Sequence, residues 1–155
     1  MARAVLRDIA CHLPAQVLDN ATLAAGHEHW TPEKILEKTG IRERRIAAEG
    51  ETAGDLAFAA AEALFRRGRV AREDVDFVIL CTQAPDYVLP TTACVLQHRL
   101  GIPTRAGAFD MNLGCSGYVY GLALAKSLVE AGLARCVLLL KAPPAEPHNM
   151  QQLKG

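Results

Sequence analysis

The sequence predicts an α/β fold in which helices cover a mostly parallel central sheet. Three short apolar segments without alternation, at residues 76–81, 106–110 and 136–140, are typical of strands buried on both faces of a parallel sheet. Apolar residues recur at helical spacing between these segments, and strands separated by helices of about 10–17 residues imply crossover connections within one layered sheet. The length of 155 residues is enough for about one domain with a proper core.

The N-terminal third is expected to contribute short elements. Residues 4–9 are predicted to form a first strand, and residues 18–39 are predicted to be helical in pieces. Thr31 is a good N-cap because a first-turn Pro and an acidic residue follow it. Gly40 ends this region, and residues 41–46 are predicted to form an edge strand.

The clearest helix prediction begins at Thr52 and ends at Gly68, because apolar residues recur between them at helical spacing. A second helix is expected from Thr91 or Thr92 to about residue 100, and a third over residues 116–132. Residues 141–155 hold three of the eight prolines and show no periodicity. The predicted organisation is therefore one domain over residues 1–140 and an irregular tail over residues 141–155.

The charge balance and the cysteines exclude several classes of function. The chain has 17 basic and 17 acidic residues, so a surface for nucleic acid or an anionic membrane has no compositional support. No apolar run approaches the roughly 20 residues of a membrane-spanning helix, and the chain start shows no secretory signal, so a cytoplasmic location is expected. The five cysteines form no C-x-x-C pair, so we expect no metal site and no disulfide scaffold.

The most informative segment is residues 109–118, FDMNLGCSGY, which places the thiol of Cys115 where a buried strand turns into a long apolar helix. A helix N-terminus presents unpaired N–H groups and partial positive charge, which favour a thiolate nucleophile. The same N–H groups can face the oxygen of an acyl group carried by that sulfur. Gly114 and Gly117 would leave room for a substrate. The alternative is that Cys115 is only a small packed residue at a helix start.

Residues 109–122, FDMNLGCSGYVYGL, resemble the active-site segment of β-ketoacyl-acyl-carrier-protein synthase III and related thiolase-fold condensing enzymes. Residues 33–44, EKILEKTGIRER, resemble the T-G-I-x-x-R region of that family, and residues 84–94 resemble its proline-bounded loop and the following helix. The resemblance covers residues 1 to about 140. It implies a thiolase-like layered fold, present as an incomplete N-terminal half.

The resemblance implies a two-step acyl transfer. Cys115 would take an acyl group from a coenzyme A thioester, and a malonyl unit on acyl carrier protein would then decarboxylate and attack it. Acyl-coenzyme A or acyl carrier protein thioesters would be substrates, and no cofactor is expected. The pathway would be fatty-acid or polyketide-like synthesis, and acyl carrier protein would be a partner.

The same resemblance assigns substrate-binding positions to Lys38, Leu89 and Gly114. Leu89 occupies the place of a bulky gatekeeper in a loop that reaches into the partner subunit in family dimers, which implies a homodimer or heterodimer. Its alternative is ordinary core packing. Lys38 would lie near the mouth of the substrate tunnel, and its alternative is a solvated cation at a helix end.

The sequence also departs from the family pattern. Lys34 stands where relatives have an aromatic ring that stacks on adenine, although an ammonium group could pair with a phosphate as a point charge. The primer could therefore be either kind of thioester. The family's catalytic His and Asn belong to its second half, and His148 and Asn149 match no such motif. We therefore expect the chain to be inactive alone, with a non-catalytic dimer partner or a truncated remnant as alternatives.

Overall fold

The computed structural model describes residues 3–25, 27 and 29–143 of the 155-residue chain. The chain divides into two compact units. Within the described residues, unit 1 comprises residues 3–12 and 52–143, and unit 2 comprises residues 13–25, 27 and 29–51.

Unit 1 is built on a three-stranded parallel sheet in the order β4-β3-β5. The strands are β3 (Phe77–Cys81), β4 (Gly107–Met111) and β5 (Val137–Lys141). Cys81 at the end of β3 is in register with Met111 of β4 and with Lys141 of β5, so the carboxyl ends of all three strands meet at one edge. The predicted parallel sheet is therefore confirmed.

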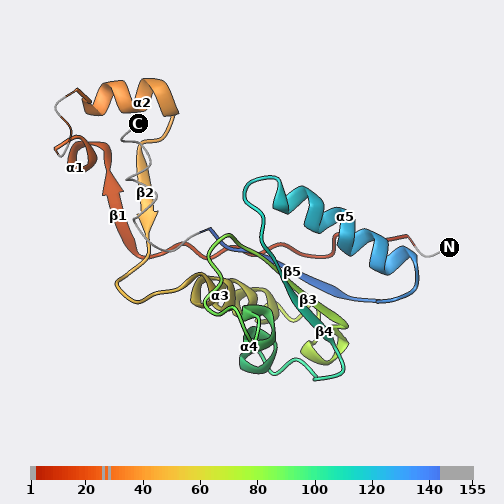
Figure 1. The fold of residues 1–155 in the computed structure, drawn as a ribbon. Coiled ribbons are helices and arrows are strands. Elements are labelled where there is room, and N and C mark those ends of the chain that lie inside the picture. The colour runs from red at the N-terminus through yellow and green to blue at the C-terminus, as the bar shows by residue number, and fades with distance from the viewer. Residues whose placement is uncertain (1–2, 26, 28, 144–155) are drawn as a thin grey trace. The chain divides into compact units, whose positions relative to one another are not determined.

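Helices cover both faces of this sheet. They are α3 (Ala53–Phe65), α4 (Thr92–Arg99) and α5 (Gly117–Glu130), with a short 3-10 helix η1 (Arg72–Asp74) before β3. Figure 1 shows α3 and α4 on one face of the sheet and α5 on the other. The main core lies between the sheet and the α3–α4 face, where Val78 and Leu80 of β3 are fully buried among residues of both helices.

The start of α3 shows why the helix begins at the predicted residue. Thr52 is its N-cap, and the Thr52 hydroxyl accepts the Asp55 N–H at 3.1 Å while the Asp55 carboxylate accepts the Thr52 N–H at 3.2 Å. This reciprocal capping box satisfies two of the helix's free donors. Gly68, three residues after the helix, has a positive φ of 67°, as the predicted stop requires.

Unit 2 is a two-stranded antiparallel ribbon with two short helices. Strand β1 (Gln16–Asp19) pairs with β2 (Glu43–Ile46), so the predicted edge strand within residues 41–46 is confirmed. The helices are α1 (Asn20–Ala24) and α2 (Pro32–Thr39). Thr31 caps α2 as predicted, since its hydroxyl accepts the Lys34 N–H at 3.2 Å, and Gly40 ends α2 with a φ of 68°.

The N-terminal strand prediction was wrong. Residues 4–9 are irregular, and their polar contacts are with side chains of unit 1 instead of a neighbouring strand. Arg67 donates to the Asp8 carboxylate at 3.0 Å and to the Ile9 carbonyl at 2.6 Å. Each of these contacts engages a single polar group of the segment, and they do not form a ladder of backbone hydrogen bonds with a strand. Leu18, predicted as the start of a helical region, lies instead in β1.

The last strand extends slightly beyond the predicted domain boundary at residue 140. It runs to Lys141, and the N–H of the buried Ala142 still donates to the Cys81 carbonyl at 3.1 Å. Residues 144–155 of the predicted tail, with His148 and Asn149, lie outside the described residues. Among the described residues, none of the helices has the length and apolar character needed to cross a membrane.

Candidate active site

Cys115 lies in the turn between β4 and α5, two residues before the first helical residue Gly117, and its side chain is exposed. Open α/β sheets bind ligands outside the carboxyl ends of their strands, and Cys115 is at that edge. Ser116 is the N-cap of α5, but its side chain makes no capping hydrogen bond. The thiol therefore stands next to a 14-residue helix whose first turn is not capped by its own N-cap side chain.

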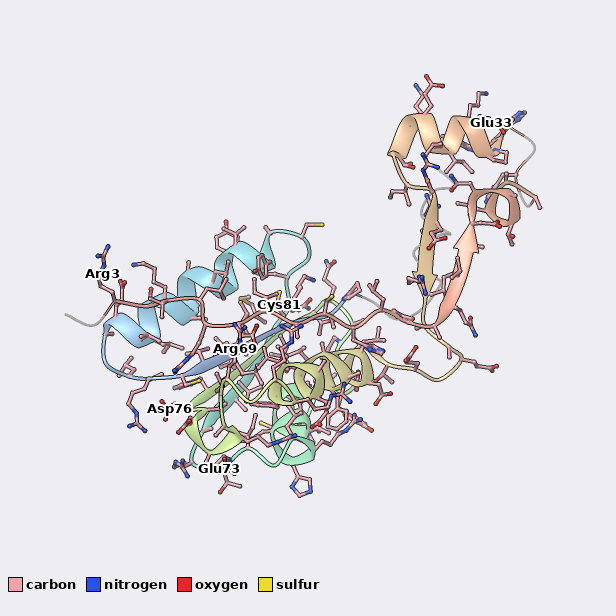
Figure 2. All side chains as sticks on the ribbon, turned by 180° about the vertical axis from the view of Figure 1, so that it is seen from behind. Arg3, Glu33, Arg69, Glu73, Asp76 and Cys81 are labelled. Atoms are coloured by element: carbon pink, nitrogen blue, oxygen red, sulfur yellow. The ribbon has the colours of Figure 1, made fainter. Side chains whose placement is uncertain are left out.

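The turn is held close to the sheet by Gly117. A Cβ atom at Gly117 would lie 2.2 Å from Cys81 Sγ and 2.8 Å from Leu113 Cβ. The Cys81 thiol donates to the Leu113 carbonyl at 3.3 Å, so β3 also holds the turn by a hydrogen bond. Figure 2 shows Cys81 within the sheet. Gly117 thus makes room for a buried thiol of β3, whereas the sequence analysis expected it to make room for a substrate.

Gly114 faces a polar side chain that the sequence analysis missed. A Cβ atom at Gly114 would lie 2.8 Å from Gln83 Oε1 and 3.4 Å from Gln83 Nε2. Gln83 follows β3 by two residues and is exposed, so its amide lies beside the residue that precedes Cys115. The signal was available, because neighbouring parallel strands bring residues just after their carboxyl ends together. The substrate-binding role of Gly114 stays a prediction.

Asp110, on the strand that leads to Cys115, is a second residue that the sequence analysis missed. Its carboxylate accepts the Thr92 N–H at 2.8 Å and the Ala93 N–H at 2.7 Å. These are the first two N–H groups of α4, where negative charge is stabilising. A carboxylate inside an otherwise apolar strand was the signal. Asp110 therefore ties β4 to α4.

Leu89 lies in the loop between β3 and α4 and is 87% exposed, and Val88 is 92% exposed. Leu89 is therefore not part of the core of unit 1. The loop presents two adjacent apolar side chains to solvent, which is the arrangement expected of a contact surface. The role of Leu89 in substrate binding stays a prediction.

Lys38 lies in the last turn of α2 and is exposed. It belongs to unit 2 and Cys115 belongs to unit 1, and its role at a substrate tunnel stays a prediction. The nearby Lys34 ammonium donates to the His29 carbonyl at 3.3 Å, so this ammonium has a partner in its own chain.

The opposite end of the sheet has a different chemistry. A cavity of about 250 Å³ there is lined by Arg7, Val70, Asp74, Arg135 and Cys136. Burial raises the pKa of the Cys136 thiol, and the carboxylates of Asp76 and Asp74 raise it further. Cys136 is therefore held as a neutral thiol and is a poor nucleophile. In the part of the chain that the structure describes, no three His, Cys, Asp or Glu side chains are grouped to hold a metal ion.

The segment that contains Cys115 matches a known protein family. The family model for 3-oxoacyl-[acyl-carrier-protein] synthase III matches residues 109–145, which include Cys115. A β-ketoacyl-[acyl-carrier-protein] synthase III of Rhodospirillum centenum is 46% identical over 140 residues, covering 90% of this chain and 43% of the relative.

Two solved structures resemble the chain closely. One 3-oxoacyl-(acyl-carrier-protein) synthase III is 70% identical with a TM-score of 0.90, covering 92% of this chain and 42% of that one. The synthase III of Thermus thermophilus is 45% identical with a TM-score of 0.80, covering 87% and 41%. This chain thus spans about two-fifths of the length of these relatives. Over the part that it spans, the chain matches a fragment of the β-ketoacyl-[acyl-carrier-protein] synthase III family and has a thiolase-like α/β fold.

Proposed function

We propose that Cys115 is the acyl-accepting nucleophile of a condensing enzyme that makes β-ketoacyl thioesters. The observation that carries the proposal is the exposed thiol at the carboxyl end of β4 and the N-terminus of α5. The family model covers this same segment. Among the described residues Cys11 is also exposed, but it lies in the irregular N-terminal segment and not beside a helix start.

In the first step the Cys115 thiolate attacks the carbonyl carbon of an acyl thioester. The carbon–sulfur bond of the thioester breaks, and the thiolate of coenzyme A or of acyl carrier protein leaves and takes up a proton. The N–H groups at the start of α5 support this step, because a helix N-terminus stabilises the negative charge that develops on the carbonyl oxygen.

In the second step a malonyl group on acyl carrier protein loses carbon dioxide, and the resulting carbanion attacks the acyl carbon. A carbon–carbon bond forms, the bond from carbon to Cys115 sulfur breaks, and the β-ketoacyl product stays on the carrier protein. In the family, a His and an Asn polarise the malonyl thioester in this step. We assign these two roles to none of the 155 residues. We therefore expect the chain alone to be acylated without completing the condensation.

The other predicted positions take supporting roles in this proposal. Lys38 lies near the mouth of the substrate tunnel, Gly114 leaves space beside the sulfur, and Leu89 closes the acyl pocket of a partner subunit. The proposed partners are acyl carrier protein and a second subunit, either identical or related, in the cytoplasm.

The direct test is to incubate the chain with short acyl-coenzyme A and acyl carrier protein thioesters and to locate the added mass by peptide mapping. We expect one acyl group on Cys115, no adduct in Cys115→Ala, and an unchanged adduct in the matched variant Cys136→Ala. The absence of an adduct with every thioester would overturn the proposal.

A second candidate function is that of a non-catalytic subunit which donates its loop to a partner. The exposure of Val88 and Leu89 supports it. The discriminating experiment is co-purification with a full-length synthase III. Stable co-assembly together with a Cys115 that no thioester acylates would favour this reading over the first.

A further inference from the structure

We infer that Asp86 and Thr92 are positioning residues which fix the loop carrying Leu89 and thereby set how sharply the site selects acyl groups. This inference rests on the proposed function, because it concerns the choice of primer at Cys115. Both residues lie in unit 1 and neither is assigned by the motifs discussed above.

The carboxylate of Asp86 fastens the loop to the start of α3. Its Oδ1 accepts the Gly54 N–H at 3.0 Å, and its Oδ2 accepts the Thr52 hydroxyl at 2.9 Å. Gly54 is the second residue of a 13-residue helix, so its N–H is one of the free donors of the first turn. A carboxylate from 32 residues along the chain thus supplements the local cap of α3.

The position of Asp86 is closely fixed because Gly54 leaves just enough space for it. A Cβ atom at Gly54 would lie 2.1 Å from Asp86 Oδ2, 2.9 Å from Asp86 Cγ and 3.1 Å from Thr92 Cγ2. Any residue with a side chain at position 54 would displace the Asp86 carboxylate. The glycine is therefore part of the anchor.

Thr92 holds the same loop from its other end. Its hydroxyl accepts the Asp86 N–H at 2.9 Å, and its own N–H is bound by the Asp110 carboxylate of β4 at 2.8 Å. Thr92 is the first residue of α4 and is 1% exposed. A continuous set of hydrogen bonds therefore runs from α3 through the loop and α4 to the strand that leads to Cys115.

Asp86 and Thr92 form the anchored stem of the loop, whereas Val88 and Leu89 form its exposed tip. The tip can act as a pocket wall of defined depth only if its stem does not shift. Apolar pockets discriminate between substrates that differ by one methylene by about 10- to 200-fold. Such discrimination requires a rigid pocket wall. Loosening Asp86 or Thr92 should therefore reduce discrimination more than it reduces turnover of the preferred primer.

The first experiment measures amide hydrogen exchange of residues 83–91 in the full chain. Asp86→Ala and Thr92→Val should raise exchange of this segment by about tenfold or more relative to wild type, because they remove acceptors of the loop N–H groups or the contact to α3. Thr92→Ser keeps the hydroxyl and should preserve the wild-type rate. Asp74→Asn, an exposed carboxylate outside this network, is the matched control.

The second experiment measures the ratio of the Cys115 acylation rates for a short and a long acyl-coenzyme A. Both primers compete for the same folded protein, so a simple loss of stability does not change this ratio. We expect it to move toward one by about fivefold or more in Asp86→Ala and Thr92→Val. We expect wild-type values in Thr92→Ser and Asp74→Asn.

The outcomes separate the inference from the function on which it rests. Acylation of wild type with an unchanged ratio in both loop variants would overturn the inference and leave Cys115 as the nucleophile. Unchanged hydrogen exchange in both variants would also overturn it. A wild-type chain that no thioester acylates would overturn the proposed function and this inference with it.

Discussion

Because Gly117 has no side chain, the turn that contains Cys115 can pack closely against the sheet. Gly117→Ala should destabilise the chain by about 1–3 kcal/mol, because its Cβ would need the space of the fully buried Cys81 thiol and of Leu113. Urea unfolding followed by circular dichroism measures the effect. The additional substitution Cys81→Ala should recover part of the loss.

Gly121, one turn further along α5, provides the matched comparison. A Cβ atom there would lie 2.7 Å from Leu139 Cδ1 and 3.3 Å from Met111 Cε, which are the ends of flexible side chains. These ends can move, so Gly121→Ala should cost less than Gly117→Ala. An equal loss of unfolding free energy in the two variants would contradict the view that the short, buried Cys81 side chain cannot make room for a Cβ atom at position 117.

At the scale of single residues, the sequence was sufficient to place Cys115 at a strand-to-helix transition but not to identify its neighbours. The thiol could be located because a strand-to-helix transition is visible in the local pattern of residues 109–118. The contacts that Gln83, Asp86 and Asp110 make could not be predicted in this way. Their contacts with Gly114, Gly54 and Thr92 join positions distant in sequence, and periodicity contains no information about such pairs.

The start of β5 depends on one carboxylate, that of Asp76. Its Oδ2 accepts the Arg135 N–H at 2.6 Å and the Cys136 N–H at 3.1 Å. The Arg135 N–H is the main reason that the pKa of Asp76 lies below its ordinary value of 3.8, and the Cys136 N–H adds to it. Figure 2 shows Asp76 at the end of the sheet opposite Cys81.

Asp76→Asn should therefore lower the free energy of unfolding at neutral pH by about 1–2 kcal/mol. The folded-state pKa is lowered, so the carboxylate stabilises the fold above its unfolded pKa, and this contribution is lost as the pH falls from about 4 toward the folded value. Urea unfolding between pH 3 and pH 7 should show a steeper acid loss in wild type than in the variant. Parallel pH profiles would contradict the prediction, and Asp74→Asn is the control.

At the scale of elements, the predictions succeeded where the signal was local. Helix α3 was predicted from the helical spacing of its apolar residues and from Gly68 as its stop, and the three buried strands from continuous apolar runs. The prediction of a strand over residues 4–9 failed because an apolar run indicates a preference for extended backbone but does not provide a neighbouring strand to pair with. Strand β1 (Gln16–Asp19) was missed, and Leu18 was predicted to be helical, because the partner of β1 is a distant polar strand, Glu43–Ile46, and pairing is a long-range property.

At the scale of the molecule, unit 1 leaves substantial apolar surface uncovered. Large apolar side chains are exposed on the N-terminal segment, on the loop before α4 and on α5, including Val5, Leu6, Val88, Leu89 and Val119. Within the described residues, β4 pairs with β3 along one edge and its other edge has no strand partner. Exposed apolar patches and open strand edges both favour association.

We therefore expect the chain to self-associate, and sedimentation velocity across a range of concentrations measures this. Replacing the two loop-tip residues by Val88→Ser and Leu89→Ser should shift the distribution toward the monomer, because the tip contributes the two most exposed of the large apolar side chains. Arg66→Ser, an exposed polar position on unit 1, should leave the distribution unchanged. A monomer at every concentration would contradict this view, since it would show that the uncovered apolar surface is tolerated in water without a partner.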